Sequence, residues 1–369
     1  MPRLLVDISA HGYGHLAQTA PVLADLRRAR PEIELTVRTA LPAVVLARRI
    51  GRPFVHLPTA SDFGFVMHNA IEIDVAASVG RYRALHADWP ERVAAEAARL
   101  RALAPDLVLA NAAYLPLAGA AAAGIAAVGL CSLNWADLFA TFHGGETWAV
   151  AAEQEMIDAY ASARAFLRVT PGLPMPRLGN RREIGPIARV ADRAAAASRR
   201  ERVGTALGLP TNAKWGLLAM GGMDFRVAIE TWVADPRQYW ICPAAWKVAG
   251  ANLRDFDDAR LAAHGLTFFD LLTSADVVLT KPGYGTFAEA VCNGVPLLYL
   301  PRGNWAEEAP MVGWARRNGR IDALPQPVPP GFDPRQCLER LWSDLAPSPP
   351  LADGAAEAAE IIGGLLRDA

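Results

Sequence analysis

The chain has 369 residues, 52% of them hydrophobic and 20% charged, with a formal net charge of −1. That length is enough for two domains, and the composition excludes an intrinsically disordered chain. A net charge near zero gives no general attraction to phosphate backbones or anionic lipid, so we expect no nucleic-acid partner, and peripheral membrane contact is not indicated.

The cysteines and the N-terminal residues indicate the cellular compartment of the protein. The four cysteines, Cys131, Cys242, Cys292 and Cys337, show no CxxC spacing, which fits a reducing compartment, and we expect a cytoplasmic protein without a metal site. The first residues lack an apolar core of signal length and predict a strand, and no apolar run approaches the roughly 20 residues that a membrane span needs.

Short apolar segments alternate along the chain with alanine-rich amphipathic stretches, a pattern typical of a parallel sheet covered by helices on both faces. In the first half we expect helices over 16–29 and 90–104, and strands at 3–9, 33–39, 54–58, 106–111, 126–131 and 166–170. Proline and glycine become frequent over 170–190, and the periodicity is lost there. The second half repeats the pattern with strands at 215–220, 239–243, 266–269, 276–280, 296–301 and 320–324, and a closing helix over 351–368.

This order predicts an α/β protein of two doubly wound, Rossmann-like domains facing each other across a cleft. We expect an N-terminal domain at 1–170, a linker at 171–203, a second domain at 204–345, and a C-terminal helix in 346–369 that packs back towards the first domain. Ligands of such sheets bind at the carboxyl ends of the strands, so the cleft is the expected active site.

The segment KPGYGT, residues 281–286, runs from a strand into a helix and predicts an anion site. Its glycines let a ligand approach the backbone, and the helix start offers unpaired amide hydrogens. Lys281 precedes this loop. Thr286 and Glu289 have the spacing of a capping box, so Glu289 either caps the helix or accepts hydrogen bonds from a ribose diol. Glu307 and Glu308, after the next strand, suit sugar hydroxyls or a solvated first helical turn.

The segment HGYGH, residues 11–15, also follows a strand. Gly12, Gly14 and Ala17 fit a variant dinucleotide fingerprint, with Arg38 near a ribose phosphate, and this would indicate a nicotinamide dehydrogenase. The bulky His15 within the loop argues against that interpretation. The alternative is a loop that places an imidazole in the cleft, where it accepts a proton from a hydroxyl. His11 and His15 also have a zinc-like spacing, but no third ligand is evident.

These motifs resemble GT-B glycosyltransferases. The segment 281–301 is similar to their donor-binding segment, and 12–26 is similar to the glycine-histidine loop that opens their N-terminal domain. A closer resemblance, to the glycosyltransferase-like N-terminal region of L-arabinokinases, is carried by the segments 11–15, 120–139, 172–189, 217–225, 281–290 and 301–310. We expect that region alone here, without the sugar kinase activity. Asn111 stands where an aspartate is often seen.

The resemblance implies a metal-independent, inverting transfer of a hexose or pentose from a nucleotide-sugar, a UDP-sugar, to an unidentified acceptor, with no further cofactor and with His15 as catalytic base. The donor-binding residues that it implies are Gly221, Gly222, Phe268, Phe269, Lys281, Gly283, Tyr284, Gly285, Thr286, Glu289, Glu307 and Glu308. The acceptor-side residues are His11, Gly12, Tyr13, Gly14, Asn134, Trp135 and Asp137.

Plainer interpretations stay open for several of these residues. Gly221 and Gly222 also fit a tight turn, Phe268 and Phe269 a core strand, Trp135 ordinary packing, and Asp137 a helix cap. Two other functions stay open as well. A nucleotide-sugar epimerase of the same fold would need carboxylates around the sugar, with Glu72, Asp74 and Glu146 as candidates. A non-catalytic nucleotide-sugar sensor would explain Asn111.

Overall fold

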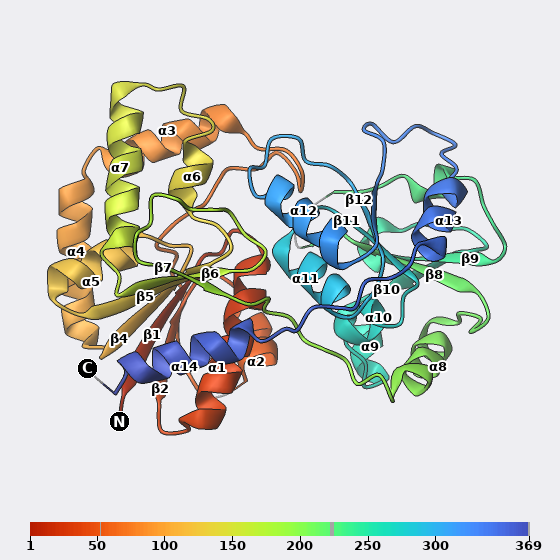
Figure 1. Cartoon of the computed structure of the whole chain (residues 1–369), viewed down its shortest axis with the longest axis horizontal. Helices are drawn as coiled ribbons and strands as arrows, with labels where there is room; N and C mark the ends of the chain where they lie inside the picture. Colours follow the sequence, from red (N-terminus) through yellow and green to blue (C-terminus); the bar gives the residue numbers. More distant parts are fainter. Residues whose placement is uncertain (52, 222–224, 368–369) are drawn as a thin grey trace.

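The protein is described here by a computed structural model that covers residues 1–51, 53–221 and 225–367. Two lobes lie side by side, each built on one parallel sheet (Figure 1). Gly222, one of the predicted donor-binding residues, lies outside the described residues.

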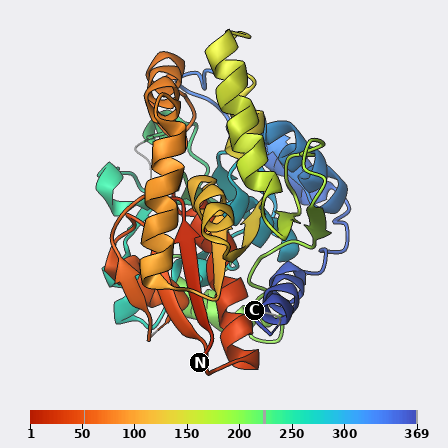
Figure 2. The ribbon, with the colours of Figure 1, turned by 90° about the vertical axis from the view of Figure 1, so that its left-hand side faces the viewer.

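The N-terminal lobe holds a seven-stranded sheet in the order β3-β2-β1-β4-β5-β6-β7. Its strands are β1 (Arg3–Ile8), β2 (Glu34–Arg38), β3 (Val55–Leu57), β4 (Leu107–Asn111), β5 (Ala126–Cys131), β6 (Ala165–Val169) and β7 (Arg181–Ile184). One face is covered by α1 (Gly14–Ala29), α2 (Ala43–Ile50) and α14 (Gly354–Leu365). The other face carries α3 (Val75–His86), α4 (Trp89–Leu103), α5 (Leu115–Ala123), α6 (Trp135–Phe139) and α7 (Thr147–Ala161). Figure 2 shows this lobe from its outer side, with α4 in orange and α7 in yellow-green.

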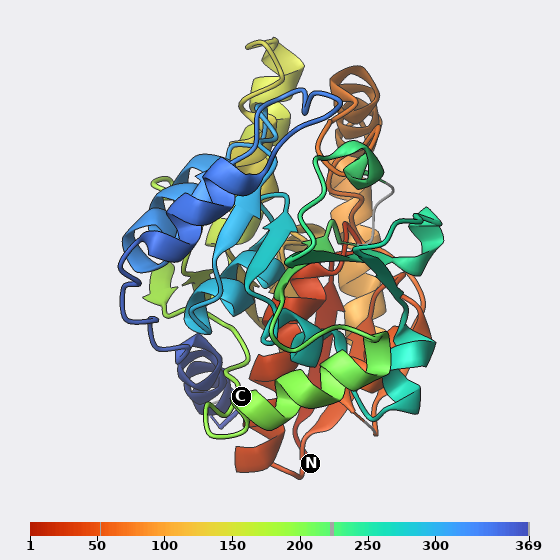
Figure 3. The same ribbon diagram turned by 90° about the vertical axis from the view of Figure 1, so that its right-hand side faces the viewer.

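The C-terminal lobe holds a six-stranded sheet in the order β10-β9-β8-β11-β12-β13. Its strands are β8 (Lys214–Ala219), β9 (Gln238–Pro243), β10 (Leu253–Phe256), β11 (Val277–Thr280), β12 (Leu297–Tyr299) and β13 (Ile321–Ala323). One face is covered by α8 (Ala196–Leu207), α9 (Asp258–Ala263), α10 (Phe268–Leu272), α11 (Tyr284–Cys292) and α12 (Glu308–Asn318). The other carries α13 (Arg335–Ser343) and the short turn η1 (Ile229–Thr231), and η2 (Ala244–Trp246) follows β9. Figure 3 shows the molecule with this lobe towards the viewer and α8 in green at the front.

The predicted fold class is confirmed, because both sheets are parallel throughout and helices cover both faces of each. The strand predicted at 266–269 is wrong. Thr267 begins a helix there: its hydroxyl accepts from the backbone N–H of Asp270, and the Asp270 carboxylate accepts from the backbone N–H of Thr267. This capping box starts α10 in spite of the two phenylalanines that suggested a strand.

Two strands were not predicted from the sequence, because they lie at sheet edges and carry charged residues. β7, Arg-Arg-Glu-Ile, is the edge strand of the first sheet and lies inside the segment expected as a linker. β10, Leu-Arg-Asp-Phe, is an edge strand of the second sheet. Edge strands face solvent along one side, so their sequences need not be continuously apolar.

The last helix of the chain belongs to the N-terminal lobe in space. α14 packs along α1, and Ala358 and Ile362 are fully buried in the same core as Leu23 and Leu26. Figure 1 shows α14 crossing beneath the first lobe, with both chain ends at that lobe. Over the described ranges, no helix combines the length and the apolar character that crossing a membrane requires.

Candidate functional site

A cavity of about 460 Å³ lies between the two lobes. Its walls come from the segments that follow the carboxyl ends of β1, β5, β8, β9, β10, β11 and β12, together with α2 and the start of α10. Its volume is in the range of a small-molecule site. Gly283 and His15, from opposite lobes, both line it. The cleft expected from the sequence is therefore present.

The C-terminal wall is centred on the first turn of α11. Gly283 is the extended residue before the helix, and no side chain caps the helix start. The first intrahelical bond runs from Phe287 N–H to Gly283 C=O, which leaves the preceding helical amides without intrahelical partners. The capping-box alternative for Thr286 and Glu289 does not form, because α11 starts at Tyr284 after Gly283 and Thr286 lies within its first turn.

Lys281 is the cation next to this helix start. A Cβ added to Gly283 would lie 3.7 Å from Lys281 Nζ, and one added to Gly221 would lie 4.0 Å from Lys281 Cε, so the side chain runs between two glycines. Gly221 has φ +77, a conformation that a side chain would strain. Burial lowers the pKa of Lys281 to about 7, with a further contribution from the nearby Arg302. In the part of the chain that the structure describes, its ammonium forms no ion pair.

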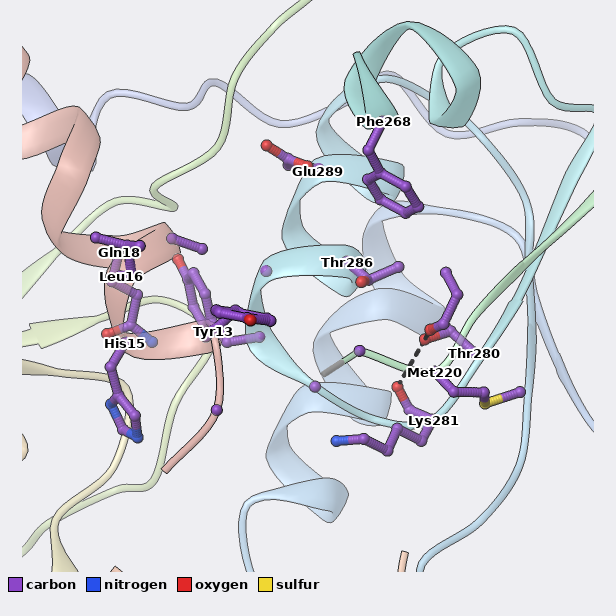
Figure 4. A pocket seen from close by; sticks show the side chains of 18 of the residues that line it. Tyr13, His15, Leu16, Gln18, Met220, Phe268, Thr280, Lys281, Thr286 and Glu289 are labelled. Carbon is purple, nitrogen blue, oxygen red and sulfur yellow. Dashed lines mark hydrogen bonds between the residues drawn. The ribbon is translucent and has the colours of Figure 1, made fainter. Parts of the chain in front are cut away.

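Glu289 lies at the opposite end of the cavity from Lys281, close to Phe268, with Thr286 between them (Figure 4). One oxygen of its carboxylate, Oε1, accepts a hydrogen bond of 2.7 Å from Arg189 Nε, a residue of the segment between the lobes. The guanidinium of Arg189 lies over the ring of Phe269, 4.3 Å from its centre. Phe269 thus lies behind the cavity wall and supports Arg189, whereas Phe268 lines the cavity.

The loop after β12 contributes a carboxylate and a cation. Glu307 is buried, accepts hydrogen bonds from Ser132 Oγ (2.5 Å) and Trp305 Nε1 (3.1 Å), and has a pKa raised by burial. Arg302 lines the same wall, with its guanidinium 3.9 Å from the centre of the Trp305 ring. Glu308 does not line the cavity, because its carboxylate accepts from the backbone N–H of Arg302 and so holds the loop in place.

The N-terminal wall places His15 opposite α11. Its Nδ1 lies 2.8 Å from Asn111 Oδ1, while Asn111 Nδ2 donates to Thr19 Oγ1 at 3.0 Å. These bonds fix the amide orientation, so His15 donates through Nδ1 and Nε2 is the unprotonated, basic nitrogen. Burial lowers the pKa of His15 to about 4, so the ring is neutral near pH 7. Gly12, with φ +94, provides the backbone turn before α1.

Trp135 was predicted on the acceptor side, but it does not line the cavity. Its ring is fully buried, its Nε1 donates to Asp62 Oδ2 at 2.7 Å, and its edge packs against His11 and His15 at 5.3 and 5.5 Å between ring centres. A fully buried ring offers no face to a sugar. Asn134 caps α6 by accepting from the backbone N–H of Asp137, so these two residues hold the loop behind the histidines.

The other predicted residues are distributed as follows. The cavity is lined by His15, Gly221, Phe268, Lys281, Gly283, Tyr284, Gly285, Thr286, Glu289, Glu307, His11, Gly12, Tyr13 and Gly14. It is not lined by Phe269, Glu308, Asn134, Trp135 and Asp137. Two lining residues also join the lobes. The hydroxyl of Tyr284 donates to Thr170 C=O and accepts from Ile187 N–H, both at 2.9 Å. A Cβ on Gly285 would lie 3.1 Å from Ala17 Cβ.

Two doubly wound lobes with a shared cavity at the carboxyl ends of their strands define the architecture. The chain has the GT-B glycosyltransferase fold. Structures with this GT-B arrangement include the glycosyltransferase of kitacinnamycin, 15% identical at a TM-score of 0.61, over 100% of this chain and 95% of that one. VinC in complex with DTDP is 18% identical at a TM-score of 0.58, over 99% and 95% of the two chains. UGT2 of Phytolacca americana, complexed with UDP-2-fluoro-glucose and pterostilbene, is 13% identical at a TM-score of 0.56, over 100% and 95%.

Among curated proteins, the L-arabinokinase of Arabidopsis thaliana is 23% identical over 310 residues, which is 82% of this chain. The chain spans 28% of the length of that relative. This similarity agrees with the resemblance carried by the sequence motifs. No protein-family model matches the chain.

The residues invoked for other functions do not face the GT-B cavity. Arg38, needed for the nicotinamide interpretation, is 1% exposed and forms ion pairs with Asp7 and Glu96. The carboxylates proposed for an epimerase are absent from the cavity lining: Glu72 accepts from Asn69, Asp74 caps α3, and Glu146 accepts from Trp148. Within the described residues, no three side chains of the His, Cys, Asp and Glu types form a metal-binding group.

Several lining or supporting residues were missed by sequence reasoning. Arg302 lies three residues after β12, at the same sheet edge as Lys281. A cation at that position could have been predicted from the sequence to line the cavity. Gln18 and Ser132 link the N-terminal wall to Glu307, since Gln18 Nε2 donates to Ser132 Oγ at 2.8 Å. Arg189 lies in the segment expected as a linker, and its contact with Glu289 spans 100 residues of sequence, so no local pattern reveals it.

Proposed function

We propose that the chain is a glycosyltransferase that moves a sugar from a UDP-sugar to an acceptor hydroxyl, without a metal ion and with inversion at the anomeric carbon. One observation carries the proposal. The Lys281 side chain runs between Gly221 and Gly283, with its ammonium beside Gly283 at the uncapped start of α11, in a cavity that His15 lines from the opposite lobe.

In the proposed complex the donor lies along the cavity with its nucleobase at one end and its sugar at the other. Its diphosphate lies on the first turn of α11, where the helix amides and Lys281 neutralise its charge. The nucleobase then lies against Phe268, and the ribose diol donates to Glu289, whose Oε1 is held by Arg189. The transferred sugar points towards His15 and Glu307. The ligands of two GT-B structures, DTDP and UDP-2-fluoro-glucose, support a nucleoside diphosphate donor.

In the proposed step the acceptor oxygen attacks the anomeric carbon while the bond from that carbon to the diphosphate oxygen breaks. The bonding electrons leave with the diphosphate, and Lys281 and the helix start stabilise the charge that develops there. The acceptor proton passes to His15 Nε2, because Nδ1 is occupied by its bond to Asn111. Attack opposite the leaving group inverts the anomeric configuration.

The experiment is a transfer assay with UDP-sugars and a panel of hydroxyl acceptors, read as UDP release and product mass. His15→Ala should abolish acceptor-dependent UDP release while UDP binding, followed by thermal shift, is retained. Glu289→Ala should lower the thermal shift with UDP. Transfer that survives His15→Ala would remove His15 as the base.

A second candidate function, a nucleotide-sugar sensor, is favoured by the neutral partner of His15. Asn111 offers a hydrogen bond but no negative charge to a protonated ring, and the low pKa of His15 makes it a weak base. A sensor predicts donor binding without acceptor-dependent turnover or donor hydrolysis, so the same assay decides between the two functions.

A further inference from the structure

Arg302 is a cation of the cavity that lies near Glu307 and Glu308 but forms an ion pair with no described residue. Its Nε is buried and makes no hydrogen bond to a described residue. Burial lowers its pKa to about 10, so it stays charged at neutral pH. A desolvated guanidinium without a partner costs free energy, and that cost is offset when an anionic group binds.

The position of Arg302 differs from that of Lys281. Lys281 runs between Gly221 and Gly283 at the start of α11. Arg302 instead lies on Trp305, whose ring stacks on His11 of the acceptor-side wall with 5.8 Å between ring centres and an interplanar angle of 4°. Arg302 also lowers the pKa of His11 more than Lys281 does. Arg302 is therefore on the side of the cavity where the transferred sugar would lie.

The two cations have separate tasks in a bound donor. The diphosphate is met by Lys281, the amides of α11 and the backbone at Gly221. A neutral sugar would place only hydroxyls against Arg302, whereas a carboxylate would pair with its planar guanidinium through two parallel hydrogen bonds. Glu307 is engaged by Ser132 and Trp305, and its carboxylate suits sugar hydroxyls rather than a second negative charge.

We propose that the transferred sugar carries a carboxylate that binds Arg302, so that the donor is a nucleoside diphosphate uronate. This inference rests on the proposed function and names the donor class of the same cavity. The carboxylate belongs to the donor and not to the acceptor, so binding of the donor alone, without an acceptor, tests the inference.

The test is calorimetric binding of UDP, UDP-glucose and UDP-glucuronate to the full chain. The wild-type protein should bind UDP-glucuronate about tenfold or more tightly than UDP-glucose, the range expected for a charge-assisted hydrogen bond. Arg302→Gln should bring this ratio close to one, and its loss of affinity for UDP-glucuronate should exceed its loss for UDP. Arg302→Lys keeps the charge but not the paired geometry, and should retain part of the preference.

Arg237→Gln is the matched control, because Arg237 is 86% exposed and its removal changes the net charge equally without touching the cavity. It should leave the preference unchanged. Equal affinity of the wild-type protein for UDP-glucose and UDP-glucuronate overturns the inference, as does an Arg302→Gln variant that weakens all three ligands by the same factor. Failure of UDP itself to bind would contradict the proposed function instead.

Discussion

Replacing Asn111 with aspartate should raise the pKa of His15 by about three units. In the wild-type protein the ring is buried against a neutral amide, and burial holds its pKa at about 4. The substitution is isosteric and places a negative charge about 4 Å from an imidazolium charge, which at an effective dielectric constant of about 20 is worth about 4 kcal/mol. Since one pKa unit corresponds to about 1.4 kcal/mol, His15 of the variant should titrate near pH 7.

The assay is a pH titration of the imidazole nitrogen signals by NMR, with His15→Gln identifying the His15 signals among those of the seven histidines. The wild-type ring should stay neutral, protonated on Nδ1, from pH 5 to pH 9, and the Asn111→Asp ring should titrate near neutrality. Thr19→Val is the control, because it removes the hydroxyl to which Asn111 donates and adds no charge. Its His15 pKa should stay near the wild-type value.

If His15 is the base, its proton affinity should also limit the rate. A base with a pKa nearer the working pH is more effective, so Asn111→Asp should increase acceptor-dependent transfer at pH 7. A wild-type His15 that titrates near pH 6.5, or a variant in which the ring is still neutral at pH 5, would refute the electrostatic account of this pair.

Three further predictions concern pH and the contact between lobes. The pKa of His15 falls from 6.5 in the unfolded chain to about 4 in the folded protein, so stability is lost as pH falls from 6.5 to 4. The loss amounts to about 3 kcal/mol. His15→Gln should flatten this part of the stability profile measured by urea unfolding. Lys281 has a pKa of about 7 and binds diphosphate best when protonated, so UDP affinity should fall from pH 7 to pH 8.5, and Lys281→Met should remove the trend. Tyr284→Phe removes the partner of the half-buried C=O of Thr170 and of the buried N–H of Ile187, and should lower the free energy of unfolding by about 2–4 kcal/mol.

The fold follows from the sequence wherever a strand is buried on both faces. β4 and β11 are continuous apolar runs that a helix-covered parallel sheet requires. The errors occur where local chemistry competes with hydrophobicity. The capping-box spacing was noted as an alternative for Thr286 and Glu289, where an extended Gly283 starts the helix earlier, and was overlooked at Thr267 and Asp270, where the box forms. Edge strands β7 and β10 carry no such apolar signal.

The candidate site was predictable as far as its two loops, because each glycine-rich loop follows a parallel strand and so lies at the carboxyl edge of its own sheet. What the sequence did not provide was the direction of each side chain. Trp135 was expected to face the cleft, but it packs into the core behind His11 and His15. Arg189 and Glu289 meet through tertiary folding alone, and the hydroxyl of the cavity-lining Tyr284 bonds to the other lobe. These contacts join distant segments, which residue spacing does not encode.

The most direct test of the central claim is the affinity of UDP for the wild-type chain and for Lys281→Met, measured by calorimetry at pH 7. If the diphosphate lies beside Lys281 at the start of α11, UDP binds the wild-type protein and its affinity falls about tenfold or more in the variant, since a hydrogen bond to a charged group is lost. Absence of binding to the wild-type protein, or equal affinity of the two proteins, would contradict the account.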